Sequence, residues 1–254
     1  MADVIHLPHP RPDGLLRVHG LNAIYGSARV LFDIGLNVAN GEAVALLGRN
    51  GAGKSTTMKA IMGLVRVTSG QVEFAGSDIS GGQTHDISRL GLAFVPEDRR
   101  IFTSLTVAEN LEVGRQPPRE GAPEWTPDRL FELFPNLAER RASLASRMSG
   151  GEQQMLAVAR ALMSNPKAML LDEPSEGIAP IIIDQMTAAI RALKAAGIAI
   201  LISEQNLSFA KRICDRAYIL EKGAVTYSGR MQDLIDNPDI SVTYLAVGMQ
   251  SPPP

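Results

Sequence analysis

The segment GRNGAGKS, residues 48–55, has the residue types and spacing of a loop that binds phosphate groups. It matches the pattern G-x-x-x-x-G-K-[ST], follows the apolar run AVALL and opens a segment with helical spacing, as this pattern requires. Glycines let backbone N–H groups point inward, and the helix N-terminus beyond them adds positive potential for a polyphosphate. Lys54 would reach the β- and γ-phosphates of a nucleotide, and the Ser55 hydroxyl would bind Mg²⁺. The residues expected around the phosphates are Gly48, Arg49, Asn50, Gly51, Ala52, Gly53, Lys54, Ser55 and Thr56.

The segment AMLLDEP, residues 168–174, would supply the acidic half of the same site. An apolar strand carries Asp172 to its carboxyl end, where ligands gather in open α/β sheets. Asp172 would hold Mg²⁺, and Glu173 would polarise the attacking water. Buried strands that end in acids are common, so this pattern indicates a nucleotide site only in combination with the phosphate loop.

The segment RMSGGEQQMLAVARALM, residues 147–163, predicts a helix with an unusual first turn. Ser149 and Glu152 have the spacing of a capping box. That explanation leaves Gly150 and Gly151 unaccounted for, because glycine is a poor choice inside a helix. Two bare positions are reasonable if a phosphate of another molecule approaches this helix end.

The elements that must position these residues follow from hydrophobic periodicity. The runs LLRVHGL, VLFDIGLNV and EAVALL predict antiparallel strands between residues 15 and 47, and QVEFAGSDI predicts a further pair. Met58, Ile61, Met62 and Leu64 give the segment after the phosphate loop its helical spacing. A block of helices then interrupts strands, which return as AMLLDE and IAILIS around a helix from about residue 180 to 196. The latter helix is expected to bury Ile181, Ile182, Ile183, Met186, Ile190 and Leu193. Strands alternating with helices predict a parallel α/β sheet with an inserted helical block.

Composition places few further limits on function. The chain has 254 residues, 45% of them apolar, and 25 Lys plus Arg balance 27 Asp plus Glu, so nothing in the bulk charge indicates nucleic acid binding. Its one cysteine, Cys214, cannot form an internal disulfide and is expected to be a small buried side chain. No apolar run is long enough to span a bilayer, and the start lacks the apolar centre of a signal peptide.

Together these motifs resemble the nucleotide-binding subunits of ABC transporters. MSGGEQQ resembles their LSGGQ signature, and Ser149 lies 23 residues before Asp172 (149 to 172), a spacing the family shares. The resemblance implies that ATP and Mg²⁺ are bound and that two cassettes meet head to tail. The signature residues of one, Ser149, Gly150, Gly151 and Glu152, would then close over ATP held by the other. It also implies that Tyr25 stacks on adenine; otherwise Tyr25 packs on a neighbouring strand residue.

The same resemblance implies a domain organisation, with a P-loop ATPase core, an antiparallel β subdomain and an inserted helical subdomain. Residues 14–97 would form the β subdomain and the part of the core with the phosphate loop. Residues 98–165 would form the helical subdomain with the signature, and residues 166–248 the rest of the core and a C-terminal helix. Residues 1–13 and 249–254 would be flexible tails.

Three segments depart together from the commonest pattern of the family. AFVPEDRR has Glu97 where most cassettes have the glutamine that touches Mg²⁺ and senses the membrane subunits. PSEGIAP replaces the usual SALD-like loop after Glu173, and SEQN has Gln205 where a histidine normally contacts the γ-phosphate. An amide can still donate to a phosphate but cannot shuttle a proton. The resemblance therefore gives Lys54, Glu173 and Gln205 the catalytic roles, and Ser55, Glu97 and Asp172 the contacts to Mg²⁺.

These departures resemble the ATPase subunits of branched-chain amino acid importers and their urea and amide relatives. The implied partners are a second ATPase subunit, identical or a sister, permease subunits that span the membrane and, indirectly, a periplasmic binding protein. The chain would then be cytoplasmic, on the inner face of the cell membrane. The groove that receives the permease would include EDRRIFTSLTVAENL; the alternative is that Phe102 and Leu105 only pack beneath the helical block. Rival interpretations are an exporter subunit, a soluble cassette acting on DNA or ribosomes, and a P-loop kinase, which leaves Gly150 and Gly151 unexplained.

Overall fold

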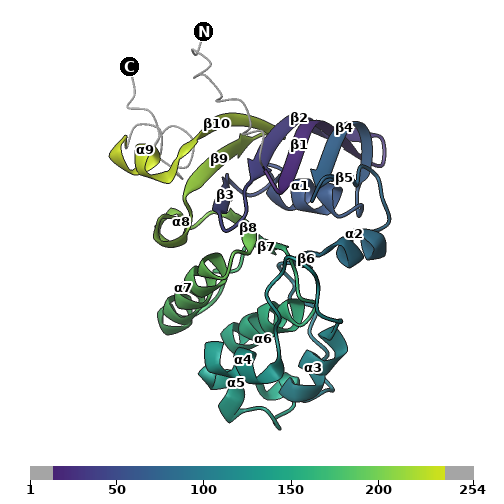
Figure 1. The fold of residues 1–254 in the computed structure, drawn as a ribbon. Helices are drawn as coiled ribbons and strands as arrows, with labels where there is room; N and C mark the ends of the chain where they lie inside the picture. Colours follow the sequence, from purple (N-terminus) through teal and green to yellow (C-terminus); the bar gives the residue numbers. More distant parts are fainter. Residues whose placement is uncertain (1–13, 238–254) are drawn as a thin grey trace.

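A computed structural model describes residues 14–237 of the chain. The tails predicted at 1–13 and 249–254, and the end of the segment predicted as the C-terminal helix, lie outside the described residues. The fold is α/β, with an antiparallel sheet, a larger mixed sheet and a helical block (Figure 1). Among residues 14–237 no helix is both long and apolar enough to cross a bilayer.

The antiparallel sheet is built by the N-terminal strands in the order β2-β1-β4-β5. Their bounds are β1 Leu16–Tyr25, β2 Ala28–Val38, β4 Arg66–Phe74 and β5 Ser77–Asp78. Buried positions alternate along the first half of β1, as expected for a sheet with one face on the core. Helix α1, Lys54–Ile61, lies under this sheet in Figure 1.

The mixed sheet has the order β10-β9-β3-β8-β7-β6, and all its pairings are parallel except the β9–β10 hairpin. Its strands are β3 Ala43–Leu47, β6 Leu92–Val95, β7 Ala168–Asp172, β8 Ala199–Glu204, β9 Arg216–Glu221 and β10 Ala224–Arg230. Every residue of β3, β7 and β8 is buried, because both faces of the sheet are covered. The carboxyl ends of these three strands lie side by side, which is where the chemistry-bearing residues gather.

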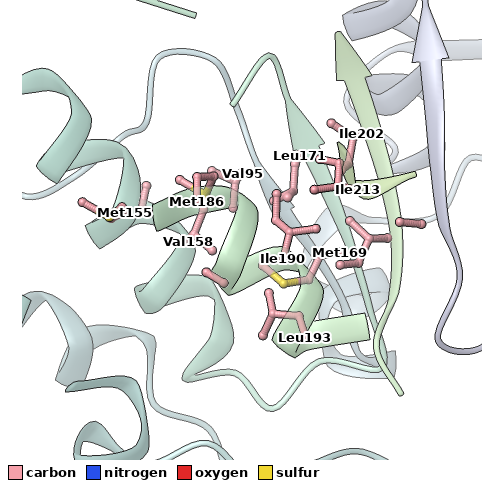
Figure 2. Close-up of a cluster of buried hydrophobic side chains, with 14 of the residues drawn as sticks. Val95, Met155, Val158, Met169, Leu171, Met186, Ile190, Leu193, Ile202 and Ile213 are labelled. Carbon is pink, nitrogen blue, oxygen red and sulfur yellow. The ribbon is translucent and has the colours of Figure 1, made fainter. Parts of the chain in front are cut away.

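Helices cover the mixed sheet and form the block beyond it (Figure 1). The block contains α3 Val107–Gly114, α4 Pro127–Leu133, α5 Pro135–Glu139, a 3₁₀ turn at Ala145–Arg147 and α6 Gly150–Leu162. The remaining helices are α2 Thr84–Leu90, α7 Pro180–Ala195, α8 Leu207–Ile213 and α9 Met231–Asp236. Figure 2 shows how Met186 and Ile190 of α7 join residues of α6 and of the sheet in one buried cluster.

Three details of the sequence prediction were wrong. The run EAVALL is not part of the antiparallel sheet: β3 pairs in parallel with β8 and β9, and its unbroken apolar run fits a strand buried on both faces. Leu64 lies past α1 and is 49% exposed, because Gly63, at φ 70°, ends the helix in a Schellman turn. Ile181 is 64% exposed in the first turn of α7, whereas Met186, Ile190 and Leu193 are buried as predicted.

Cys214 is buried, as predicted. Burial raises the pKa of its thiol, so the side chain stays neutral and behaves as a small apolar group.

Candidate nucleotide-binding site

The phosphate loop connects β3 to α1 and turns on glycines in the left-handed region. Gly51 and Gly53 have φ values of 78° and 110°. A Cβ at Gly48 would lie 2.6 Å from the carbonyl oxygen of Leu220, so no larger residue fits there. Lys54, only 3% exposed, folds back across the loop and donates from Nζ to the Gly48 carbonyl oxygen at 2.8 Å. The phosphate loop is thus closed by a hydrogen bond from the side chain of its own lysine, Lys54, to its first residue, Gly48.

Two residues 117 positions apart meet at the carboxyl end of β7. Ser55 Oγ donates to Asp172 Oδ1 at 2.9 Å, and Ser203 Oγ donates to the same oxygen at 2.5 Å. The sequence predicted that Ser55 and Asp172 would share a site, and the structure brings them together. Ser203, opposite Asp172 in the β7–β8 ladder, was not predicted.

Glu173 is held in a strained backbone conformation one residue past β7. Its φ is 47°, which costs a residue with a Cβ about 1–2 kcal/mol. The Glu173 N–H compensates by donating to the Ser203 carbonyl oxygen at 3.1 Å and to Ser203 Oγ at 3.0 Å. This turn aims the Glu173 carboxylate at Lys54, with 3.1 Å between Oε1 and Nζ.

Gln205 follows β8 and connects the two halves of the site. Its Nε2 donates to Glu173 Oε2 at 3.0 Å and to Asn50 Oδ1, on the phosphate loop, at 2.6 Å. The amide therefore lies between the carboxylate expected to activate water and the loop expected to hold the phosphates.

Lys54, Ser55 and Glu173 face a cavity of about 350 Å³, whereas Asp172 and Gln205 are not among its lining residues. Its lining residues are Asn50, Gly51, Gly53, Lys54, Ser55, Thr56, Glu97, Glu173 and Glu176. The structure thus places Glu97 beside the phosphate loop, and it adds Glu176, which the sequence did not single out. Burial raises the pKa of Glu176 above its usual value, and the nearby Glu173 and Glu97 raise it further. The cavity therefore gathers more negative charge than a single lysine balances, which suits a divalent cation.

The signature turn does not line this cavity. Ser149 caps α6: its Oγ accepts the Glu152 N–H at 3.3 Å, and Glu152 Oε2 accepts the Ser149 N–H at 2.7 Å, which is the predicted capping box. Packing gives Gly151 a second reason to be glycine, because a Cβ there would lie 2.9 Å from two carbons of Ile182. Tyr25 is also outside the cavity lining; it is 55% exposed at the end of β1.

Comparison with known proteins identifies the family to which this chain belongs. The family profile described as "ABC transporter" matches residues 31–176, more than half of the chain. The chain belongs to the ABC transporter family. It is therefore an ATPase subunit that binds ATP.

Individual relatives match over nearly the full chain. The high-affinity branched-chain amino acid transport ATP-binding protein BraG of Pseudomonas aeruginosa is 42% identical, over 91% of this chain and 99% of its own. The lipopolysaccharide export system ATP-binding protein LptB of Escherichia coli K12 is 34% identical, over 91% of this chain and 96% of its own. A solved nucleotide-free ATP-binding cassette from an ABC transporter superposes with a TM-score of 0.76 at 26% identity, over 89% and 97% of the two chains.

The substitution Glu152→Gln tests whether the Glu152 carboxylate has any role beyond capping α6. Both its oxygens are occupied, Oε2 by the Ser149 N–H and Oε1 by Arg140 Nε at 2.8 Å. A glutamine carbonyl still accepts the N–H, so we expect Glu152→Gln to keep the ATPase rate within a few fold of wild type. The measurement is phosphate release at saturating ATP. A loss of more than tenfold would show that the carboxylate acts directly.

Proposed function

We propose that the chain is the ATP-hydrolysing subunit of an importer for branched-chain or other amino acids. The observation that carries this proposal is the 42% identity to BraG over nearly the whole of both chains. Export is the second candidate, because LptB relatives match over a similar share of the chain. The segments VPE, SEGIAP and SEQN favour the amino acid importers over the exporters, and urea or amide importers remain within the same proposal.

Magnesium fits the oxygen groups gathered at the cavity. Mg²⁺ prefers carboxylate, hydroxyl and phosphate oxygens and needs few of them from the protein. Ser55 and Asp172 already touch one another, and Glu97 lines the same cavity. In the proposed complex Ser55, Asp172 and Glu97 would hold the ion. When bound, the ion would neutralise charge developing on the β- and γ-phosphates.

Hydrolysis would be carried by Lys54 and Glu173, which line the cavity, and by Gln205, which contacts Glu173. Glu173 accepts the proton of the attacking water, because its carboxylate is 8% exposed and lies at the edge of the phosphate loop. Lys54 turns from the carboxylate to the β- and γ-phosphates. Gln205 donates from Nε2 to the γ-phosphate in place of Asn50, while its carbonyl orients the water. The base role falls on Glu173 alone, since an amide does not take up a proton at neutral pH.

Two subunits would complete one ATP site. None of residues 149–152 lines the cavity of its own chain, so the signature turn is available to a second copy or to a sister ATPase subunit. In such a pair the N-terminus of α6, where the N-cap Ser149 is exposed, would present backbone N–H groups to the γ-phosphate of the partner's ATP. Tyr25, exposed beyond the phosphate loop, stacks on the adenine.

A second hollow offers a place for a permease. This groove, of about 650 Å³, lies between α2, β6 and the helical block and is lined by His85, Arg89, Arg99, Phe102, Arg119, Arg160 and neighbouring residues. Phe102 is 46% exposed with the Arg160 guanidinium over its ring, so it does not simply pack beneath the block. A cytoplasmic helix of a permease docked here would hold the subunit on the inner face of the membrane.

Reconstituted transport tests the proposed function. The chain is coexpressed with the permease subunits of a branched-chain amino acid importer, purified as a complex, placed in proteoliposomes and supplied with the binding protein of that importer. We expect ATP-dependent uptake of radiolabelled leucine that requires the binding protein. Uptake of urea or an amide instead would reassign the solute, and a complex that moves lipid outward without a binding protein would overturn import.

A further inference from the structure

Glu204, the last residue of β8, is a buried carboxylate that does not line the nucleotide cavity. It is 2% exposed, and a buried carboxylate is tolerated only where its oxygens are well paired. Each oxygen has a backbone partner: Oε1 accepts the Ser175 N–H at 2.9 Å, and Oε2 accepts the Asn206 N–H at 3.2 Å. Burial raises the pKa of Glu204 above its usual value, and the hydrogen bonds from the Ser175 side chain and the two backbone N–H groups offset only part of that effect.

The two donors belong to the two loops that carry the proposed catalytic residues. Ser175 lies two residues after Glu173, and Asn206 directly follows Gln205. Asn206 also caps α8, because its Oδ1 accepts the Phe209 N–H at 3.1 Å. One side chain thus joins the loop after β7 to the loop after β8 and to the start of a helix.

Two neighbouring residues, Ser203 and Gln205, also contact these loops, but neither replaces the connection made by Glu204. Ser203 fixes the start of the first loop through Asp172 and the Glu173 N–H. The contact from Gln205 Nε2 to Glu173 Oε2, at 3.0 Å, joins the same loops, but it uses the two groups that must rearrange when ATP is hydrolysed. Glu204 joins the same two loops through backbone N–H groups and does not line the cavity.

We propose that Glu204 is a positioning residue for ATP hydrolysis, which holds the loop of Glu173 and the loop of Gln205 at one fixed separation. This inference rests on the catalytic roles proposed for Glu173 and Gln205, and not on the solute or the direction of transport. A carboxylate suits the task because it accepts at both oxygens. A glutamine offers one acceptor and turns an NH₂ group toward the other backbone N–H.

The test separates turnover from nucleotide binding. We expect Glu204→Gln to lower kcat about tenfold, while the Kd for a fluorescent ATP analogue stays within about threefold of wild type. Glu204→Asp keeps the charge but is one methylene shorter, so it should show the same split and serves if the glutamine variant does not fold. Normal kcat in folded Glu204→Gln or Glu204→Asp would overturn the proposal.

A double variant tests whether Glu204 acts through the catalytic groups. If it positions Gln205 relative to Glu173, then adding Glu204→Gln to Gln205→Ala should cost less than the product of the two separate losses. A fully multiplicative loss would contradict the proposal. Normal hydrolysis by Gln205→Ala alone would instead refute the role proposed for Gln205, so the two failures are distinguishable.

Glu42→Gln is the control for loss of a carboxylate outside the site, at a side chain that is 11% exposed. Glu42 Oε2 accepts the Ala39 N–H at 2.9 Å, and its Oε1 pairs with Arg216 at 2.7 Å. It directly precedes β3, at the end of the strand opposite the phosphate loop. We expect Glu42→Gln to lower Tm as much as Glu204→Gln does while leaving kcat unchanged. Equal loss of kcat in both variants would make the effect of Glu204 one of stability alone.

Discussion

Glu173→Gln should lower the rate of ATP hydrolysis about a thousandfold while ATP still binds, since a positioned general base contributes between about 10² and 10⁴ in rate. The Glu173 carboxylate lines the cavity beside the phosphate loop, next to Lys54 and Gln205. Lys54, 3.1 Å away, is engaged with phosphate when ATP is bound, and Gln205, 3.0 Å away, takes up no proton. An amide at position 173 preserves the shape of the side chain and removes the base.

The measurement pairs steady-state phosphate release with equilibrium ATP binding. Because bound ATP is not consumed, Glu173→Gln should also accumulate as an ATP-bound dimer on gel filtration, alone or mixed with a sister ATPase subunit. Glu42→Gln, a carboxylate-to-amide change at the far end of β3, should hydrolyse ATP normally. A Glu173→Gln variant that stays strictly monomeric with ATP, alone and with the sister subunit, would refute the two-subunit site.

The local parts of this site could be predicted because a few adjacent residues determine them. Gly51 and Gly53 take positive φ within the loop itself, and the helix dipole follows directly from where α1 begins. The capping box of Ser149 and Glu152 is likewise a property of four successive residues. The meeting of Ser55 and Asp172 was predictable for a different reason: the phosphate-loop pattern and an acid at the end of an apolar strand each point to a Mg²⁺ contact, so both were assigned to one site.

The remainder depends on register and packing between distant elements. Ser203 supports Asp172 only because β7 and β8 pair in that register, and a shift of one residue would turn its side chain to the other face. Gly151 is needed where α6 meets Ile182 of α7, a contact no local pattern reveals. The apolar run of β3 was assigned to the wrong sheet for the same reason, because periodicity does not identify a strand's partners.

The SEQN segment could be read only in part. Its polar residues suggested one catalytic group after a buried strand, and Gln205 does face Glu173 and Asn50. That its neighbour Glu204 turns inward and binds two loops follows from alternation along β8, where successive side chains take opposite faces. Within β8, Ser203 therefore contacts Asp172 and Glu173, and the next residue, Glu204, contacts the backbone of Ser175 and Asn206.

Gln205→Ala should reduce ATP hydrolysis about a hundredfold, a loss typical of removing one preorganised donor to a developing negative charge. The substitution deletes the Nε2 group that joins Asn50 Oδ1 to Glu173 Oε2 and leaves the strand intact, because the side chain is exposed. ATP affinity should change much less than the rate. Stopped-flow binding and phosphate release on the same preparation would measure both.

Gln205→His is the informative companion, since it restores the residue that most cassettes have here. An imidazole N–H can donate to the γ-phosphate from a similar position, so we expect the histidine variant to retain activity within about tenfold of wild type. Loss in the alanine variant with recovery in the histidine variant would assign the function to a hydrogen-bond donor at this place. Normal hydrolysis by Gln205→Ala would show that Gln205 only ends a strand, and the γ-phosphate would then depend on Lys54 and the partner's signature turn.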